Sequence, residues 1–306
     1  MSVVPTLLAP AAPCPPAPGV GAAVGVGGAL PLPAPGWGAA DALLALELAR
    51  PLLPVTVALR VRLLGELTTV VLAAGPHVVK VYPPDTDPRH LDRVGQALAG
   101  SATAHQAAAP AVVTAHGVVT VAARLRPVGT VSWPRLGTLL RDFHAEQAGA
   151  GLPPWSPLSR LAAQVTGLPD EAASVLLAAR DALLTALQEV RSDLGVDTIH
   201  GDLSPSNVLR TARGPRLIDL DWAAAAPREY DLASASRRFR AGEISRRAYA
   251  AFCTAYGHDV LSWPGLPVLD RVADLGVVAF RIWDCRHHGR DLDWLPAQLR
   301  LWRTPL

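Results

Sequence analysis

One stretch in the second half of this chain constrains its fold more than any other feature. Residues 199–209 read IHGDLSPSNVL, and residues 217–221 read LIDLD. Short apolar runs separated by turn-forming residues predict short strands joined by tight connections. Pro205 disfavours a helix between Asp202 and Asn207 and keeps their loop tight. The stretch is therefore expected to form a compact β-like region that carries its polar side chains in loops.

Phosphoryl transfer requires groups that position a nucleotide and neutralise its charge, and this chain offers a candidate for each task. Asp202 lies in a loop from which its carboxylate can accept the proton of an attacking hydroxyl. Asn207 and Asp219 supply oxygen atoms of the kind that Mg²⁺ prefers. Asp221 faces the same way as Asp219 if the backbone stays extended, and a hydrogen-bonded loop carboxylate is the alternative. Lys80 projects an ammonium from an otherwise apolar strand, where it can hold phosphates.

Residue counts give separate support for two of these positions. Lysine occurs once, at Lys80, against 27 arginines, and asparagine occurs once, at Asn207. An arginine solvates a protein surface as well as a lysine does, but it does not easily replace a compact ammonium in a confined site. We therefore interpret both residues as functional, against the alternatives of a solvated strand-edge lysine and a polar turn.

Composition and periodicity divide the chain into three parts. Residues 1–40 contain no charged side chain and are rich in Pro, Ala and Gly, so we expect a disordered tail and neither a signal peptide nor a membrane span. Residues 41–126 contain several β-like runs, the first from Val55, and predict a small, mainly antiparallel β lobe. Residues 127–306 show mostly helical periodicity, clearest over 170–190, and predict a larger helical lobe.

Charge and cysteine content limit the expected partners. The 28 basic and 26 acidic residues leave a net charge of +2, which provides no basic face for a nucleic acid. The three cysteines are widely spaced and indicate neither a disulfide framework nor a zinc site, so we expect a reducing, cytoplasmic setting. No membrane association is expected, and the oligomeric state is left open.

The order and spacing of the motifs resemble those of the aminoglycoside phosphotransferase and choline-kinase-like branch of the protein-kinase-like superfamily. The shared features are the HGDxxxxN loop, the downstream IDxD segment, the VVK strand and the segment 227–233, whose Asp231 corresponds to a residue that buttresses the catalytic loop in the family. The resemblance covers residues 50–300 and implies an α+β, bilobal protein-kinase-like fold. In that fold a small, mainly antiparallel β N-lobe (41–126) binds the nucleotide, and a larger, mainly helical C-lobe (127–306) carries the catalytic and acceptor-binding groups.

The resemblance also implies roles for individual residues. Asp202 corresponds to the catalytic base, Asn207 and Asp219 to magnesium ligands, and Lys80 to the lysine that holds phosphates. ATP or GTP is then the donor, with Mg²⁺ as the metal. The implied activity is transfer of the γ-phosphate to a hydroxyl of a small molecule, such as an aminoglycoside, an amino alcohol or a sugar-like metabolite.

Two departures from the family pattern concern the nucleotide. Residues 88–100 contain no Glu to pair with Lys80, and Asp92 is a shorter stand-in. No G-x-G-x-x-G loop is present, so the turn with Gly65 and Thr68 is the candidate for covering the nucleotide. These departures motivate an alternative hypothesis, a non-catalytic kinase-like protein that binds a nucleotide or a partner.

The acceptor is the least determined part of the hypothesis. From Arg228 to the C-terminus there are 12 arginines and nine acidic residues, which does not favour a polycationic acceptor. Asp270, Asp274 and Asp284 nevertheless lie in the region that contacts acceptors in the family. A neutral sugar or another hydroxylated metabolite stays open.

Overall fold

The fold is seen in a computed structural model that describes residues 30–306. Most of the tail expected over residues 1–40 therefore lies outside the described residues. The last part of that segment differs from the expectation of disorder, because Leu30 is buried with Tyr82 and Trp222 in one hydrophobic cluster.

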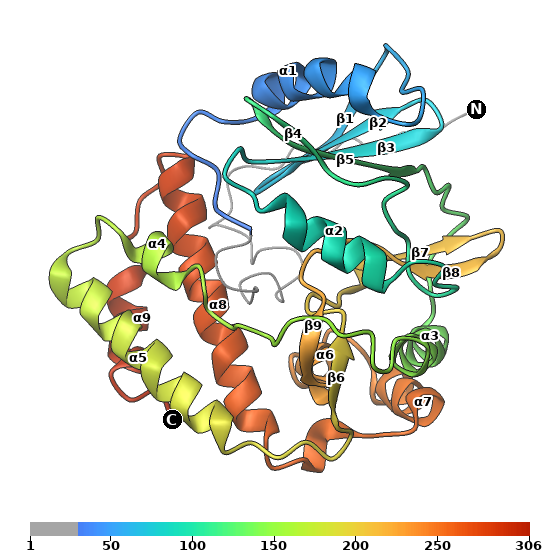
Figure 1. The fold of residues 1–306 in the computed structure, drawn as a ribbon. Coiled ribbons are helices and arrows are strands. Elements are labelled where there is room, and N and C mark those ends of the chain that lie inside the picture. The colour runs from blue at the N-terminus through green and yellow to red at the C-terminus, as the bar shows by residue number, and fades with distance from the viewer. Residues whose placement is uncertain (1–29) are drawn as a thin grey trace, which may run out of the picture.

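The N-lobe is built on a five-stranded antiparallel sheet with strand order β1-β2-β3-β5-β4. Helix α1 lies over one face of this sheet and α2 over the other, on the side of the second lobe (Figure 1). Successive side chains of β3 alternate between these faces: Val79 and Val81 are fully buried in the cluster that contains α1, whereas Tyr82 packs on the α2 side. Lys80 shares the face of Tyr82, and so it points towards the C-lobe. The elements are α1 (Ala39–Ala49), β1 (Arg62–Glu66), β2 (Val70–Ala74), β3 (His77–Tyr82), α2 (Pro88–Ala97), β4 (Val112–Thr114) and β5 (Gly117–Ala123).

The first strand begins later than the sequence indicated. A β-like run was expected from Val55, but β1 begins at Arg62 and pairs only with β2. All five of its residues are exposed, and its register shifts between Leu63 and Gly65. The apolar residues before it lie in a loop, in which Val57 is buried in the cluster formed by α1 and the sheet without pairing with a strand.

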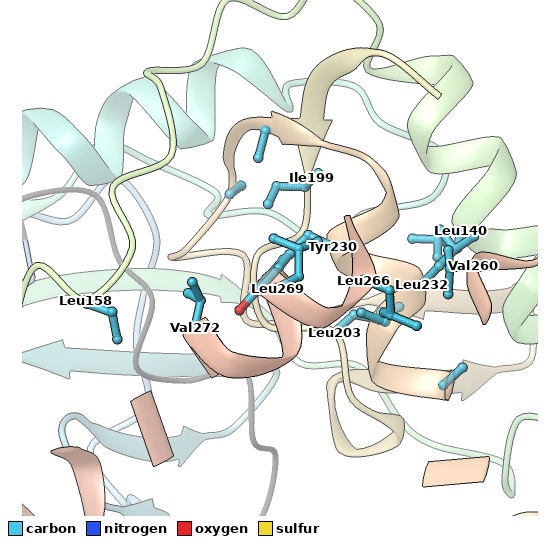
Figure 2. Packing of buried hydrophobic residues seen from close by; sticks show 14 of the residues in the cluster. Leu140, Leu158, Ile199, Leu203, Tyr230, Leu232, Val260, Leu266, Leu269 and Val272 are labelled. Atoms are coloured by element: carbon cyan, nitrogen blue, oxygen red, sulfur yellow. The ribbon is translucent and has the colours of Figure 1, made fainter. Parts of the chain in front are cut away.

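The C-lobe is mostly helical. Helix α3 packs against α7, and the long helix α8 contacts α4, α5 and α6. Figure 2 shows the centre of its core, where Leu203 and Tyr230 lie beside Leu269 of α8. The helices are α3 (Trp133–Glu146), α4 (Leu161–Val165), α5 (Asp170–Gln188), α6 (Glu229–Arg240), α7 (Arg246–Tyr256), α8 (Leu266–His287) and α9 (Leu295–Trp302). Within residues 30–306, none of the helices has both the length and the apolar character that crossing a bilayer requires.

Two short β-ladders position the loops between the lobes. Strand β6 (Val196–Ile199) pairs with β9 (Ala224–Pro227), and β7 (Val208–Thr211) forms a hairpin with β8 (Gly214–Leu217). The run expected to stay extended as far as Asp221 ends at Leu217, because Asp219 adopts a left-handed conformation with φ +61°. The chain thus turns at Asp219, directly under the N-lobe sheet.

Candidate active site

A cavity of about 220 Å³ lies between the lobes, with walls from both. The N-lobe contributes the β1–β2 turn and β3, and the C-lobe contributes the loop before β7 and the segment after β8. Seven of the eight site residues proposed from the sequence line it: Gly65, Thr68, Lys80, Asp202, Asn207, Asp219 and Asp221. Side chains as far apart in the sequence as Gly65 and Asp221 thus meet at the boundary between the two lobes.

The loop that carries Asp202 is shaped by a close backbone approach at Gly201. Its φ is +80°, and a Cβ at this position would lie 2.2 Å from the carbonyl oxygen of Trp222, so only glycine fits. Asn207 holds the other end of the loop: its Nδ2 donates to the Asp202 carbonyl oxygen at 2.8 Å and to Asp202 Oδ2 at 3.2 Å. Oδ1 of Asp202 is buried and finds no hydrogen-bond partner within residues 30–306. One carboxylate oxygen is therefore fixed while the other stays available.

Burial is the main influence on the ionisation of Asp202. It raises the pKa of this carboxyl well above its usual range, and repulsion from the Asp219 carboxylate adds to the rise. The hydrogen bond from Asn207 and the charge of Lys80 act in the opposite direction. A carboxylate with a raised pKa is a better proton acceptor than an exposed one, which suits a general base.

Asp231 connects this loop to the C-lobe core. Its Oδ2 accepts hydrogen bonds from the His200 amide at 2.7 Å and from His144 Nε2 at 3.0 Å, and its Oδ1 accepts from the Gly201 amide at 3.1 Å. The side chain is fully buried. This arrangement agrees with the buttressing role that the resemblance implied, and it fixes the backbone just before Asp202.

Lys80 joins the two lobes by pairing with two carboxylates. Its Nζ donates to Asp219 Oδ1 and to Asp221 Oδ2, and the Tyr82 hydroxyl donates to Asp221 Oδ1 at 2.8 Å. Burial alone would lower the pKa of Lys80, but the charges of Asp219 and Asp221 outweigh it and hold the pKa well above the usual value. The ammonium is therefore charged, and both acidic residues face it although the backbone between them is not extended.

The expectation for Asp92 needs correction. Asp92 was considered a partner of Lys80 near the nucleotide, but its Oδ1 accepts a hydrogen bond from the Ala111 amide at 2.7 Å and it does not line the cavity. Its short side chain satisfies the backbone of the loop that leads into β4. Lys80 uses Asp219 and Asp221 instead.

Several residues that shape the cavity were not predicted from the sequence. Tyr82 anchors Asp221, and Nε2 of the buried His90 on α2 lies 2.8 Å from the Asp221 carbonyl oxygen. Arg160 lines the cavity with its guanidinium over the Trp222 ring, 4.4 Å from the centroid. Only Tyr82, two residues after Lys80 and hence on the same face of its strand, was open to discovery from the sequence.

The oxygen donors of the cavity suit a divalent cation that is brought by phosphates. Within residues 30–306, no group of three or more His, Cys, Asp and Glu side chains is arranged as a ready metal site. Magnesium, however, usually takes one or two protein oxygens and completes its shell with phosphates and water. Asn207 and Asp219 offer such oxygens in one cavity, and the buried Oδ1 of Asp202 beside them has no partner. The residues present therefore fit a nucleotide-bound Mg²⁺.

Comparison with known proteins agrees with this geometry. Residues 42–275 match the model of the phosphotransferase enzyme family known as APH. No curated protein sequence matches the chain. Similar solved structures include choline kinase LicA from Streptococcus pneumoniae, with a TM-score of 0.57 and 15% identity over 84% of this chain and 94% of that one.

Two other similar structures contain nucleotides. Amicoumacin kinase hAmiN, in complex with AMP-PNP, Ca²⁺ and Ami, has a TM-score of 0.55 and 14% identity over 79% of this chain and 86% of that one. The GDP and kanamycin complex of APH(2")-IIia has a TM-score of 0.53 and 17% identity over 87% of this chain and 98% of that one. At such identities the likeness shows the fold alone, which is the bilobal kinase-like fold expected from the sequence.

Proposed function

Because the chain belongs to the APH phosphotransferase enzyme family, we propose that it is a small-molecule kinase that moves the γ-phosphate of ATP or GTP to a hydroxyl group. The observation that carries the proposal is the convergence of Lys80, Asp202 and Asp219 on one cavity between the lobes. A protein that only bound a nucleotide would have no need of a buried carboxylate with a free oxygen, so the same observation speaks against the non-catalytic alternative.

In the proposed reaction, the acceptor hydroxyl gives its proton to Asp202 Oδ1 as its oxygen forms a bond to the γ-phosphorus. The bond from the γ-phosphorus to the bridging oxygen breaks, and the nucleoside diphosphate leaves with that electron pair. Asn207 keeps the Asp202 carboxylate oriented throughout, through the hydrogen bonds at 2.8 and 3.2 Å. Lys80 exchanges a carboxylate partner for the inner phosphates of the nucleotide.

Three oxygen-bearing residues would hold the metal. Asn207 and Asp219 are the expected ligands. Asp221 lies close enough to take part, because its carboxylate and that of Asp219 both bind Lys80. Bound Mg²⁺ would supply charge neutralisation for the phosphates. The turn with Gly65 and Thr68 lines the cavity from the N-lobe, where it would shield the phosphates from water.

The acceptor side of the site favours an uncharged ligand over a polycation. A second cavity of about 330 Å³ lies between α6 and α8 and begins at Leu203, next to the catalytic base. Its carboxylates Asp270 and Asp274 already pair with arginines, including the bond from Arg237 to Asp274 at 2.6 Å and the ion pair of Arg240 with Asp270 at 2.7 Å. An amino group would have to displace these partners, whereas hydroxyl groups need not. A sugar-like acceptor is therefore favoured over an aminoglycoside or an amino alcohol.

The proposal is tested by measuring nucleotide turnover with Mg²⁺ for the wild type, Asp202→Asn and the control Asp181→Asn, an exposed carboxylate on α5. The acceptors are kanamycin, choline and uncharged sugars. We expect Asp202→Asn to reduce transfer by about 10²–10⁴-fold while AMP-PNP still binds, and the control to match the wild type. A wild-type protein that binds neither AMP-PNP nor GTP analogues would refute the proposal.

A further inference from the structure

Arg160 is a buried cation that takes no part in the transfer step described above. It directly precedes α4 and lines the same cavity as Lys80 and Asp202. The residue is only 9% exposed, and its hydrogen bonds within residues 30–306 go to main-chain carbonyl groups and to no carboxylate. Buried arginines in proteins are normally paired with an anion, because an uncompensated buried charge is unfavourable. The position of Arg160 therefore points to an anion that the free protein does not supply.

Neutral groups hold the guanidinium in place. One face stacks on the Trp222 ring at 4.4 Å, Nε donates to the Leu30 carbonyl oxygen, and Nη2 donates to the Pro31 carbonyl oxygen at 3.3 Å. Nη1 has no hydrogen-bond partner in the described part of the chain. Burial lowers the pKa of Arg160 to about 9, and the charge of Asp221 only partly opposes this fall. The cation is thus oriented but incompletely compensated.

The chemistry of the cavity indicates which anion belongs there. Lys80 is the single lysine of the chain, and in the proposed function it holds the inner phosphates. The terminal phosphate must lie beside Asp202, where the acceptor hydroxyl attacks. Phosphoryl transfer spreads negative charge over the oxygens of this group, and a fixed arginine is well suited to stabilise it. Arg160 is the remaining cation among the described residues that line this cavity.

We propose that Arg160 binds the terminal phosphate of the nucleotide through Nη1 and stabilises its charge during transfer. This inference rests on the proposed function. Trp222 and the carbonyl groups of Leu30 and Pro31 keep the guanidinium plane oriented, so that little side-chain freedom is lost when the phosphate arrives.

The test compares a nucleotide that has a terminal phosphate with one that lacks it. Affinities for AMP-PNP and ADP, both with Mg²⁺, are measured by calorimetry for the wild type, Arg160→Gln and Arg160→Lys. The matched control is Arg281→Gln, because Arg281 stacks on Trp294 at 4.1 Å but lies outside the cavity. We expect Arg160→Gln to weaken AMP-PNP binding by about 10-fold or more, with ADP binding changed less than about 2-fold. Arg160→Lys should retain part of the AMP-PNP affinity, and the control should retain all of it.

Retained ADP binding also shows that the variants are folded. Equal weakening of AMP-PNP and ADP would overturn the assignment to the terminal phosphate. A variant could also bind AMP-PNP as the wild type does and lose transfer only to acceptors that carry a phosphate or carboxylate. That result would assign Arg160 to acceptor binding and would overturn its assignment to the terminal phosphate. If the wild type binds neither nucleotide, the proposed function fails; if the wild type and Arg160→Gln bind AMP-PNP equally, only the role of Arg160 fails.

Discussion

Replacing Asp231 with alanine should destabilise the protein strongly, because this one buried carboxylate accepts three hydrogen bonds. Its donors are the amides of His200 and Gly201 and the ring Nε2 of His144, at 2.7 to 3.1 Å. Alanine leaves all three donors without an acceptor in a region that water does not reach. An unsatisfied buried donor costs about 1–3 kcal/mol, so we expect a loss of about 4 kcal/mol after partial relaxation.

Thermal unfolding followed by circular dichroism measures this loss. In a chain of this size 1 kcal/mol corresponds to a few degrees, so Tm should fall by about 10 °C. The matched control is Asp197→Ala. Asp197 accepts hydrogen bonds from the Gly149 and Thr198 amides and from Arg228 Nη2, but it is only half-buried and water can replace it. We expect the control to lower Tm by about 3 °C. Equal Tm values for the two variants would refute the reasoning that burial of the carboxylate sets the cost.

Three further predictions concern the site and its supports. Gly201→Ala should displace the catalytic loop, because the new Cβ would lie 2.2 Å from the Trp222 carbonyl oxygen; activity should fall by about 100-fold, whereas unchanged activity would contradict the loop geometry. Lys80→Arg should keep the charge yet reduce turnover by about 100-fold at similar Tm, since a planar guanidinium does not replace a compact ammonium; wild-type kinetics would contradict this. Burial alone would raise the pKa of Glu146, but hydrogen bonds led by the one from the Thr103 hydroxyl outweigh it and lower the pKa. The resulting stabilisation is present above the pKa of about 4.3 that Glu146 has in the unfolded chain, and it is lost as pH falls through its lower pKa in the folded protein. The Tm difference between wild type and Glu146→Gln should therefore shrink between about pH 5 and pH 3.

The sequence was sufficient for the fold and for most of the cavity, for a physical reason. Asp202, Asn207 and Asp219 lie within 18 residues, and a tight loop followed by a hairpin brings such residues together without help from distant parts of the chain. Lys80 comes from the other lobe, and its placement was inferred from the resemblance and from its being the only lysine. The small antiparallel β lobe was expected from its β-like runs, and the larger helical lobe from its helical periodicity.

The failures concern contacts that periodicity does not encode. Asp92 was expected near Lys80 because it lies on the following helix, but its side chain turns to the Ala111 amide. The strand expected from Val55 begins at Arg62, because the residues before it reach the N-lobe core from a loop, as the buried Val57 does, without pairing with a strand. Arg160 was missed because it is one arginine among 27, and only the fold shows that it is buried without a carboxylate.

The charges of the cavity explain why its clustered carboxylates do not destabilise the free protein. Asp219 and Asp221 lie close together, and without a counter-charge their repulsion would oppose closure of the lobes. Lys80 supplies that counter-charge by binding both carboxylates. In the proposed function, a nucleotide that arrives with Mg²⁺ would offer a cation to the carboxylates and anions to Lys80, so each group would exchange one partner for another of the same sign. Because Lys80, Asp219 and Asp221 keep partners of opposite charge before and after this exchange, binding need not reorder these three side chains. The same exchange would explain why a lysine with two carboxylate partners lies in a site that we propose to receive a polyanion.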